Sequence, residues 1–130
     1  MARNESLYPA DWLRIAERDW GRVEHLLIIH DAEAAGFFLQ QAIEKFLKAF
    51  LLSKGWQLQR IHDLESLLNQ ALQFDNSIER YRSILQKITG FYFVERYPFL
   101  LETGLTEEDI RTAFSEVTGL IGTLKSHLNE

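Results

Sequence analysis

The placement of proline limits this chain more than any other feature of its sequence. The 130 residues contain two prolines, Pro9 and Pro98, and none in the long stretch between them. Proline removes a backbone donor and disrupts a helix interior, so this stretch is open to long helices. It also lacks the alternation of apolar and polar residues between hairpin turns that marks strands. We therefore expect an all-α protein.

Apolar residues that recur every three to four positions divide the chain into five expected helices. These are Pro9–His30, Ala32–Lys54, Asp63–Phe74, a helix that follows residues 75–77 and ends near Phe93, and a helix that starts at the cap Thr106, with Asp109 three residues on. Asn76 with Glu79 resembles a capping box for the fourth helix, and the segment Glu95–Leu105 is expected to be a loop. Short connections favour antiparallel neighbours. The prediction is one domain, residues 1–130, folded as a four-to-five-helix up-and-down antiparallel bundle.

The second expected helix has the most unusual composition. Asp31 can cap its start and Gly55 can end it, and apolar residues cover more than one of its faces. Such a helix must be central in the fold or must face a second subunit. Polar residues are few along its middle: Gln40, Gln41, Glu44, Lys45 and Lys48.

Composition excludes several classes of site. The chain has no cysteine, which rules out disulfides, thiolate metal sites and a cysteine nucleophile. No second histidine lies at ligand spacing from His62, and the glycines form no phosphate-binding loop, so we expect no metal and no cofactor. The net charge of −5 does not favour general attraction to nucleic acid. No apolar run approaches the length of a membrane helix, and we expect a cytoplasmic protein.

Three motifs give the chain a family resemblance. The run Gln40–Ala49 (QQAIEKFLKA), the triplet His62-Asp63-Leu64 and the triplet Arg96-Tyr97-Pro98 stand in this order and together span about half of the chain. In sequence and spacing they are similar to the QQAxEKxLKA, HDL and RYP motifs of the HEPN family. The resemblance implies a helical bundle that dimerises. It also implies a small MNT-type nucleotidyltransferase as the partner, in a toxin–antitoxin-like system.

Many members of that family cleave RNA without a metal, and this chain departs from their pattern. The family's activity uses an arginine and a histidine that are separated by four to six other residues, in a cleft at the dimer interface. After Arg96 the corresponding positions hold Leu101, Glu102 and Thr103. Without an imidazole, no side chain there titrates near neutrality without a large shift. The sequence therefore leaves the question of enzymatic activity open.

Three functional hypotheses follow. The first is an interaction module that forms a homodimer through the second expected helix and the fourth or fifth, and that is the HEPN partner of an MNT-type nucleotidyltransferase. The second is an RNA-cleaving toxin with an altered site, in which Arg96 works with Tyr97 or Glu102. The third is a nucleotide-binding protein without catalysis, in which Arg96 meets phosphate together with Lys45 or Lys48.

Other polar residues are expected to serve the structure. Glu44 can pair with Lys48 one turn away, or with Arg96 across the bundle if it is buried. Asp63 is expected to cap the third helix, and His62 to bond a loop carbonyl. His30 and His127 show no partner pattern and are expected at the surface.

Overall fold

The computed structural model describes residues 5–96 and 106–129, with the backbone alone for residues 92–96. The elements are α1 (Pro9–Ile28), α2 (Ala32–Ser53), α3 (Leu64–Ala71), the 3-10 helix η1 (Asn76–Tyr81), α4 (Arg82–Arg96) and α5 (Glu107–Leu128). No strand occurs among these residues, and the prediction of an all-α bundle is confirmed.

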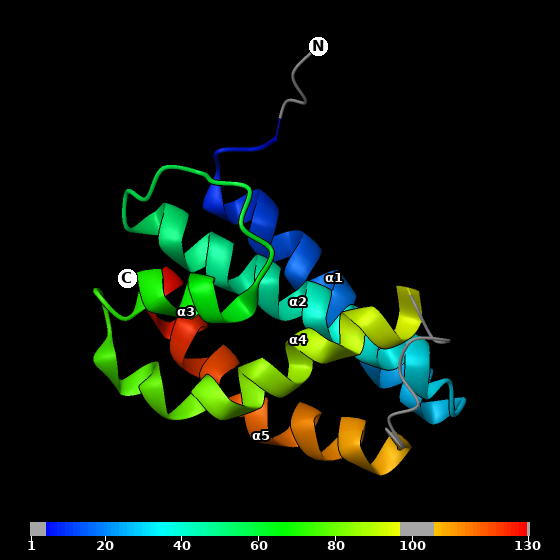
Figure 1. The fold of residues 1–130 in the computed structure, drawn as a ribbon. Coiled ribbons are helices and arrows are strands. Elements are labelled where there is room, and N and C mark those ends of the chain that lie inside the picture. The colour runs from blue at the N-terminus through cyan, green and yellow to red at the C-terminus, as the bar shows by residue number, and fades with distance from the viewer. Residues whose placement is uncertain (1–4, 97–105, 130) are drawn as a thin grey trace.

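α2 is the central helix of the bundle (Figure 1). It packs against α1, α3, α4 and α5, and more than half of its residues are buried. α1 and α4 run opposite to α2, whereas α5 runs in the same direction (Figure 1). Of the two predicted positions for this helix, the structure therefore shows the central one, and its apolar faces are covered within one chain.

The starts of α2 and α5 and the end of α4 meet at one end of the bundle, which we call the turn end because it holds the α1–α2 turn. An added Cβ at Gly36 of α2 would lie 3.1 Å from Phe91 Cβ of α4 and 3.2 Å from Ile110 Cδ1 of α5. The Arg111 guanidinium of α5 donates to the carbonyl oxygen of Leu27 at 2.6 Å. These contacts brace the α1–α2 turn.

Several helix boundaries follow from capping residues that the sequence predicted. Asp31 accepts a bond from the backbone N–H of Ala34 at the start of α2. Thr106 and Asp109 form a reciprocal capping box at the start of α5. Because side-chain caps satisfy donors that a helix leaves unpaired, these residues set where each helix begins.

Other boundaries differ from the prediction. α1 ends at Ile28, and His30 adopts a positive φ of 63° in the turn. The third helix is shorter than predicted, and the fourth begins as a 3-10 turn capped by Asp75, whose carboxylate accepts the Ser77 N–H. The capping role expected of Asn76 was therefore wrong. α4 continues past Phe93 to Arg96, so the first two residues of the expected loop are helical.

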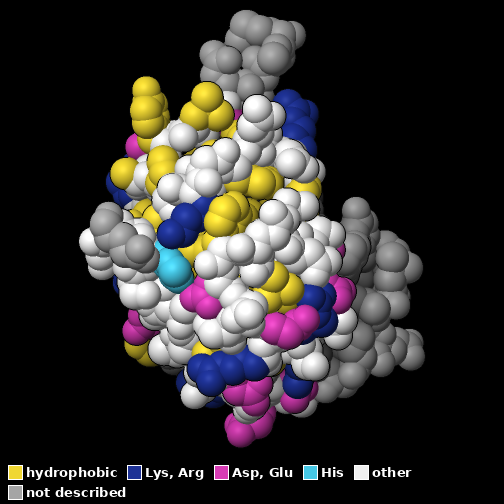
Figure 2. Space-filling view, turned by 90° about the vertical axis from the view of Figure 1, so that its left-hand side faces the viewer, with side chains coloured by type: hydrophobic (Ala, Val, Ile, Leu, Met, Phe, Trp, Pro, Cys, Tyr) yellow, Lys and Arg dark blue, Asp and Glu magenta, His cyan; other side chains and the backbone are white. Residues whose placement is uncertain are grey.

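Part of the surface is hydrophobic. Figure 2 shows hydrophobic side chains gathered in the upper part of one face, toward the N-terminal segment. Leu7 and Tyr8 of that segment are 66% and 73% exposed.

None of the helices in the described parts of the chain has both the length and the apolar character needed to cross a bilayer.

Candidate functional site

Five polar residues in the middle of α2 belong to one connected chain of hydrogen bonds and ion pairs. Residues four apart on a helix lie on the same face, so the spacing of Gln40, Gln41, Glu44, Lys45 and Lys48 brings their side chains into mutual contact. This series of contacts begins at Asp19 of α1 and ends at His62, in the connection between α2 and α3. We call these seven residues the polar chain.

Glu44 is a buried anion of the polar chain. Its side chain is 6% exposed, and its Oε2 accepts from Lys48 Nζ at 2.9 Å and lies 3.0 Å from His62 Nδ1. Its Oε1 accepts from Gln40 Nε2 at 3.3 Å. A buried carboxylate without partners would be costly, and here three donors surround it.

Lys48 is even more enclosed, with its side chain 2% exposed. Its ammonium lies 5.3 Å from the centre of the Trp12 ring, within the range of a cation–π contact. The Trp12 indole N–H in turn donates to the Ser6 carbonyl oxygen at 2.7 Å. The positive charge of Lys48 is therefore compensated within the fold, by the Glu44 carboxylate and the Trp12 ring.

Asp19 forms the other end of the polar chain, and the sequence analysis missed it. Its side chain is 3% exposed and accepts from Lys45 Nζ and Arg22 Nη1, both at 3.1 Å. Arg18 Nε lies 3.9 Å from the same carboxylate. A signal was present, because Asp19 lies one turn after buried Ala16 and one turn before buried Val23, on the apolar stripe of α1.

The two ends are joined through glutamine side chains. Lys45 Nζ donates to Gln41 Oε1 at 3.0 Å, and Gln41 Nε2 donates to Gln40 Oε1 at 2.7 Å. Gln40 Nε2 also donates to the backbone carbonyl of His62 at 3.2 Å. α1, α2 and the α2–α3 connection are thus linked by one set of polar contacts.

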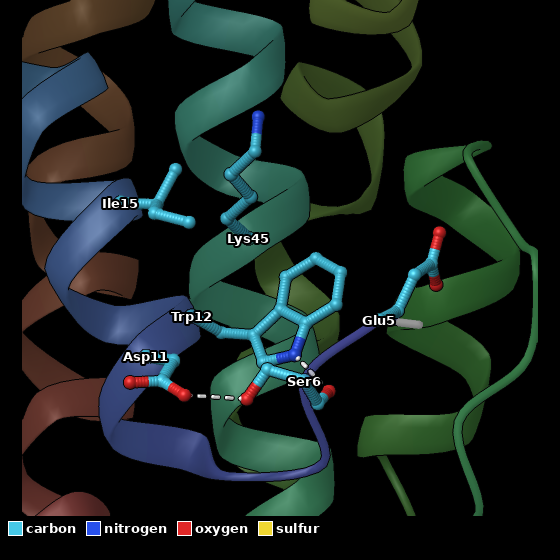
Figure 3. A pocket seen from close by; sticks show the side chains of 6 residues that line it. All are labelled: Glu5, Ser6, Asp11, Trp12, Ile15 and Lys45. Atoms are coloured by element: carbon cyan, nitrogen blue, oxygen red, sulfur yellow. Dashed lines mark hydrogen bonds between the residues drawn. The ribbon is translucent and has the colours of Figure 1, made fainter. Parts of the chain in front are cut away.

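A pocket of about 240 Å³ opens beside the polar chain. It is lined by Glu5, Ser6, Asp11, Trp12, Ile15 and Lys45 (Figure 3). Ser6 Oγ donates to Asp11 Oδ2 at 2.6 Å, which ties the N-terminal segment to α1. Two carboxylates line the pocket, and its lysine is already paired with Asp19. This balance of charge does not favour a phosphate ligand.

The structure brings some of the predicted site residues together and leaves others apart. Glu44, Lys45 and Lys48 share the polar chain, and both lysines are occupied by carboxylates. Arg96 is the last residue of α4, and its pairing with Glu44 stays a prediction because its side chain is not among those described. Tyr97 and Glu102 lie outside the described residues.

Three of the residues expected to be structural or at the surface also have definite places. Asp63 accepts the backbone N–H of Ser66 at the start of α3. His62 directs its ring to Glu44, where a loop carbonyl was expected. His127 is half-buried, with Nε2 2.8 Å from Asp75 Oδ2, and its expected place at the surface was wrong.

No group of three histidines, aspartates or glutamates within the described ranges is arranged to hold a metal ion. The carboxylates of the polar chain face ammonium and guanidinium groups. The site therefore consists of paired charges, with one imidazole at its exposed end.

Comparison with known proteins places this arrangement in a family. The family model described as HEPN domain matches residues 9–127. Among solved structures, TT1696 from Thermus thermophilus is similar with a TM-score of 0.81 and 22% identity, covering 92% of this chain and 97% of that chain. At this identity the likeness establishes the fold alone. The comparison with curated proteins found no significant match.

The match to the family model runs from the first residue of α1 to within one residue of the end of α5, and it includes the three motifs of the sequence analysis. The resemblance inferred from those motifs is confirmed. The chain belongs to the HEPN domain family.

Proposed function

We propose that the protein is a HEPN-family interaction module that works as a homodimer and binds a small MNT-type nucleotidyltransferase in a toxin–antitoxin-like system. The polar chain supports this proposal because its contacts argue against the nucleotide-binding alternative. Lys45 and Lys48, the cations that a phosphate ligand would need, already face buried carboxylates. Their charges stabilise the fold, so the motif in α2 offers little free charge to a substrate.

The observation that carries the proposal is an exposed pair of isoleucines at the turn end. Ile28 and Ile29 are 72% and 55% exposed. They project from a turn that α5 braces through Arg111, so little order would be lost when a partner covers them. Adjacent exposed apolar side chains on a rigid element favour a protein contact.

The turn end also holds the end of α4, where Arg96 lies (Figure 1). In the family, this arginine belongs to a cleft at the dimer interface. The isoleucine pair and the family motif therefore point to the same end of the bundle. We assign this end to the contact between two copies of the chain.

Light scattering at tens of micromolar tests the dimer. We expect a mass of twice the 15.2 kDa chain, and we expect the double variant Ile28→Asp/Ile29→Asp to be a folded monomer. Leu7→Asp is a matched control, because Leu7 is a similarly exposed apolar residue in the N-terminal segment. A monomeric wild type, or a dimer that only Leu7→Asp disrupts, would contradict the assignment of the turn end.

The nucleotidyltransferase partner is tested separately, by co-expressing this chain with the product of the neighbouring reading frame. We expect that product to be a small nucleotidyltransferase and to co-elute with the chain in size-exclusion chromatography. A neighbour of another kind, or separate elution, would refute the partner while leaving the dimer intact.

Thermal-shift measurements address the nucleotide-binding alternative. A ligand that binds only the folded state raises the melting temperature. Because both lysines are paired within the fold, we expect ATP and AMP to leave the melting temperature unchanged. A rise that disappears in Arg96→Ala would instead favour nucleotide binding at the turn end.

A further inference from the structure

The four histidines of the chain differ in what lies behind their rings. His25 is exposed on α1, and His30 is 74% exposed and faces Glu107, a partly exposed carboxylate that also bonds Arg111. His127 is half-buried against Asp75. His62 combines an open ring, 71% exposed, with a carboxylate that is only 6% exposed. This combination belongs to His62 alone among the four.

The buried carboxylate fixes the orientation of the His62 ring. Glu44 cannot easily move, because Lys48 and Gln40 hold its two oxygens. A ring nitrogen that faces a carboxylate oxygen at 3.0 Å must donate a proton to it, so Nδ1 carries the hydrogen. The lone pair of the neutral ring is therefore on Nε2. Gln40 also holds the backbone of His62, so the residue is anchored at two points.

A carboxylate behind an imidazole strengthens the ring as a nucleophile. It stabilises the positive charge that develops when the far nitrogen forms a bond. We propose that His62 is a phosphoryl-acceptor site, at which Nε2 takes a phosphoryl group from a donor of the phosphoramidate or acyl phosphate class.

A phosphoryl group suits Nε2 of His62 better than a larger apolar group would. The ring is open to water, and His62 does not line the pocket beside the polar chain. A phosphoryl group is small and stays hydrated. Its attachment to Nε2 leaves the Nδ1–H bond to Glu44 intact, so the product keeps every contact that positions His62 in the fold.

The transfer balances without an oxidant or reductant. The Nε2 lone pair forms a new bond to phosphorus while the bond from phosphorus to the leaving group breaks. The leaving group, ammonia or a carboxylate, takes the electron pair of the broken bond. The positive charge left on the ring is offset by the Glu44 carboxylate.

Incubation of the whole protein with potassium phosphoramidate at pH 8 tests the proposal. Phosphohistidine is followed at each histidine by peptide mass spectrometry under alkaline conditions, and its Nε2 attachment by ³¹P NMR. We expect His62 to react about tenfold faster than His25, since loss of such an orienting partner commonly costs that much. Glu44→Gln is expected to lower the His62 rate to that of His25 and to leave the His25 rate unchanged.

Two further variants separate the effect on the ring from an effect on folding. Glu44→Gln/Lys48→Met removes both buried charges, so the core is neutral while the orienting carboxylate is absent. Glu107→Gln is the matched control, because it removes the exposed carboxylate that faces His30 and should leave His62 unaffected.

Equal rates at His62 and His25 in the wild-type protein would overturn the proposal, whatever the variants do. A folded Glu44→Gln/Lys48→Met variant that keeps the wild-type rate at His62 would also overturn it. The readout does not depend on oligomeric state or on a nucleotidyltransferase, so it is independent of the function proposed above.

Discussion

Glu44 and Lys48 are opposite charges on one face of α2, and the surrounding helices leave both almost without exposed surface. Removing one partner of a buried pair leaves the other charge without compensation, at a cost of about 3–5 kcal/mol. We expect Glu44→Ala to lower the free energy of unfolding by this amount, measured by urea denaturation.

The matched controls use the same spacing at the surface and the same site without charge. Glu107→Ala breaks an i,i+4 pair with Arg111 of similar length, 2.8 Å, at a partly exposed position, and we expect a much smaller loss. Glu44→Ala/Lys48→Met should recover most of the stability that Glu44→Ala loses. Equal losses in Glu44→Ala and Glu107→Ala would show that the burial of the first pair has no energetic consequence.

Asp75 gives the molecule a predictable response to acid. Hydrogen bonds from the Ser77 hydroxyl, and then from His127, lower the pKa of Asp75 from 3.8 to about 2. A lowered pKa means that the stabilisation is complete above about pH 4 and is lost as the pH falls toward 2. We expect Asp75→Ala to cost about 1–2 kcal/mol at pH 6, as the loss of a helix cap does, and almost nothing near pH 2. Urea denaturation across this pH range measures the difference in the free energy of unfolding between the wild type and Asp75→Ala. A difference that stays constant from pH 6 to pH 2 would contradict this expectation.

At this scale the sequence predicted contacts that are local and missed those that are not. The Glu44–Lys48 pair and the Thr106 cap involve residues three or four apart, and helical geometry fixes such contacts. Asp19 and Lys45 are 26 positions apart, so their contact depends on how α1 docks against α2. Helical periodicity contains no information about that docking.

Among the elements, α2 shows how closely the helices approach at the turn end. The Cβ that Gly36→Ala adds would meet Phe91 Cβ, an atom that cannot move without the α4 backbone, and Ile110 Cδ1. Overpacking of this kind costs about 1–3 kcal/mol, which exceeds the gain of up to about 1 kcal/mol from replacing a helical glycine. We therefore expect Gly36→Ala to lower the melting temperature.

Gly21→Ala is the matched control for the same substitution. Gly21 also lies within a helix, but its added Cβ meets no atom within 4 Å. We expect this variant to raise the melting temperature, because alanine favours the helix and restricts the unfolded chain. If both alanines shift the melting temperature in the same direction, the close approach at Gly36 does not limit packing.

The helix boundaries also show where prediction from sequence stops. Residues 72–81 contain apolar positions at helical spacing, yet α3 ends at Ala71 and a 3-10 turn follows. Asp75 competes for backbone and side-chain donors there, and such local bonds interrupt a helix without changing its periodicity.

At the scale of the whole molecule, the composition of α2 left two possibilities, a central helix or one facing a second subunit. The structure satisfies the first, because a single chain buries most of α2. The case for a dimer therefore rests on the exposed turn end, where Ile28 and Ile29 lie, and no longer on the apolar character of α2.

The absence of the family's histidine after Arg96 leads to an expectation about RNA cleavage. Metal-independent cleavage needs a group that takes the 2′-hydroxyl proton near neutral pH, and imidazole is the side chain best suited to this. In the family, four to six residues separate that histidine from the arginine, and at the corresponding positions this chain has Leu101, Glu102 and Thr103. We expect the purified wild-type protein to leave a fluorescent single-stranded RNA uncleaved and its expression to leave bacterial growth unchanged.

Two variants would identify the origin of any cleavage. Loss of activity in a folded Arg96→Ala variant would revive the RNA-cleaving alternative and contradict this expectation. His30 is an exposed histidine in the α1–α2 turn, at the end of the bundle where α4 ends at Arg96, so His30→Gln would then show whether its imidazole replaces the absent one. Cleavage that survives both substitutions would arise from a contaminating nuclease or from chemistry elsewhere on the molecule, because neither the arginine nor an imidazole at that end would be responsible.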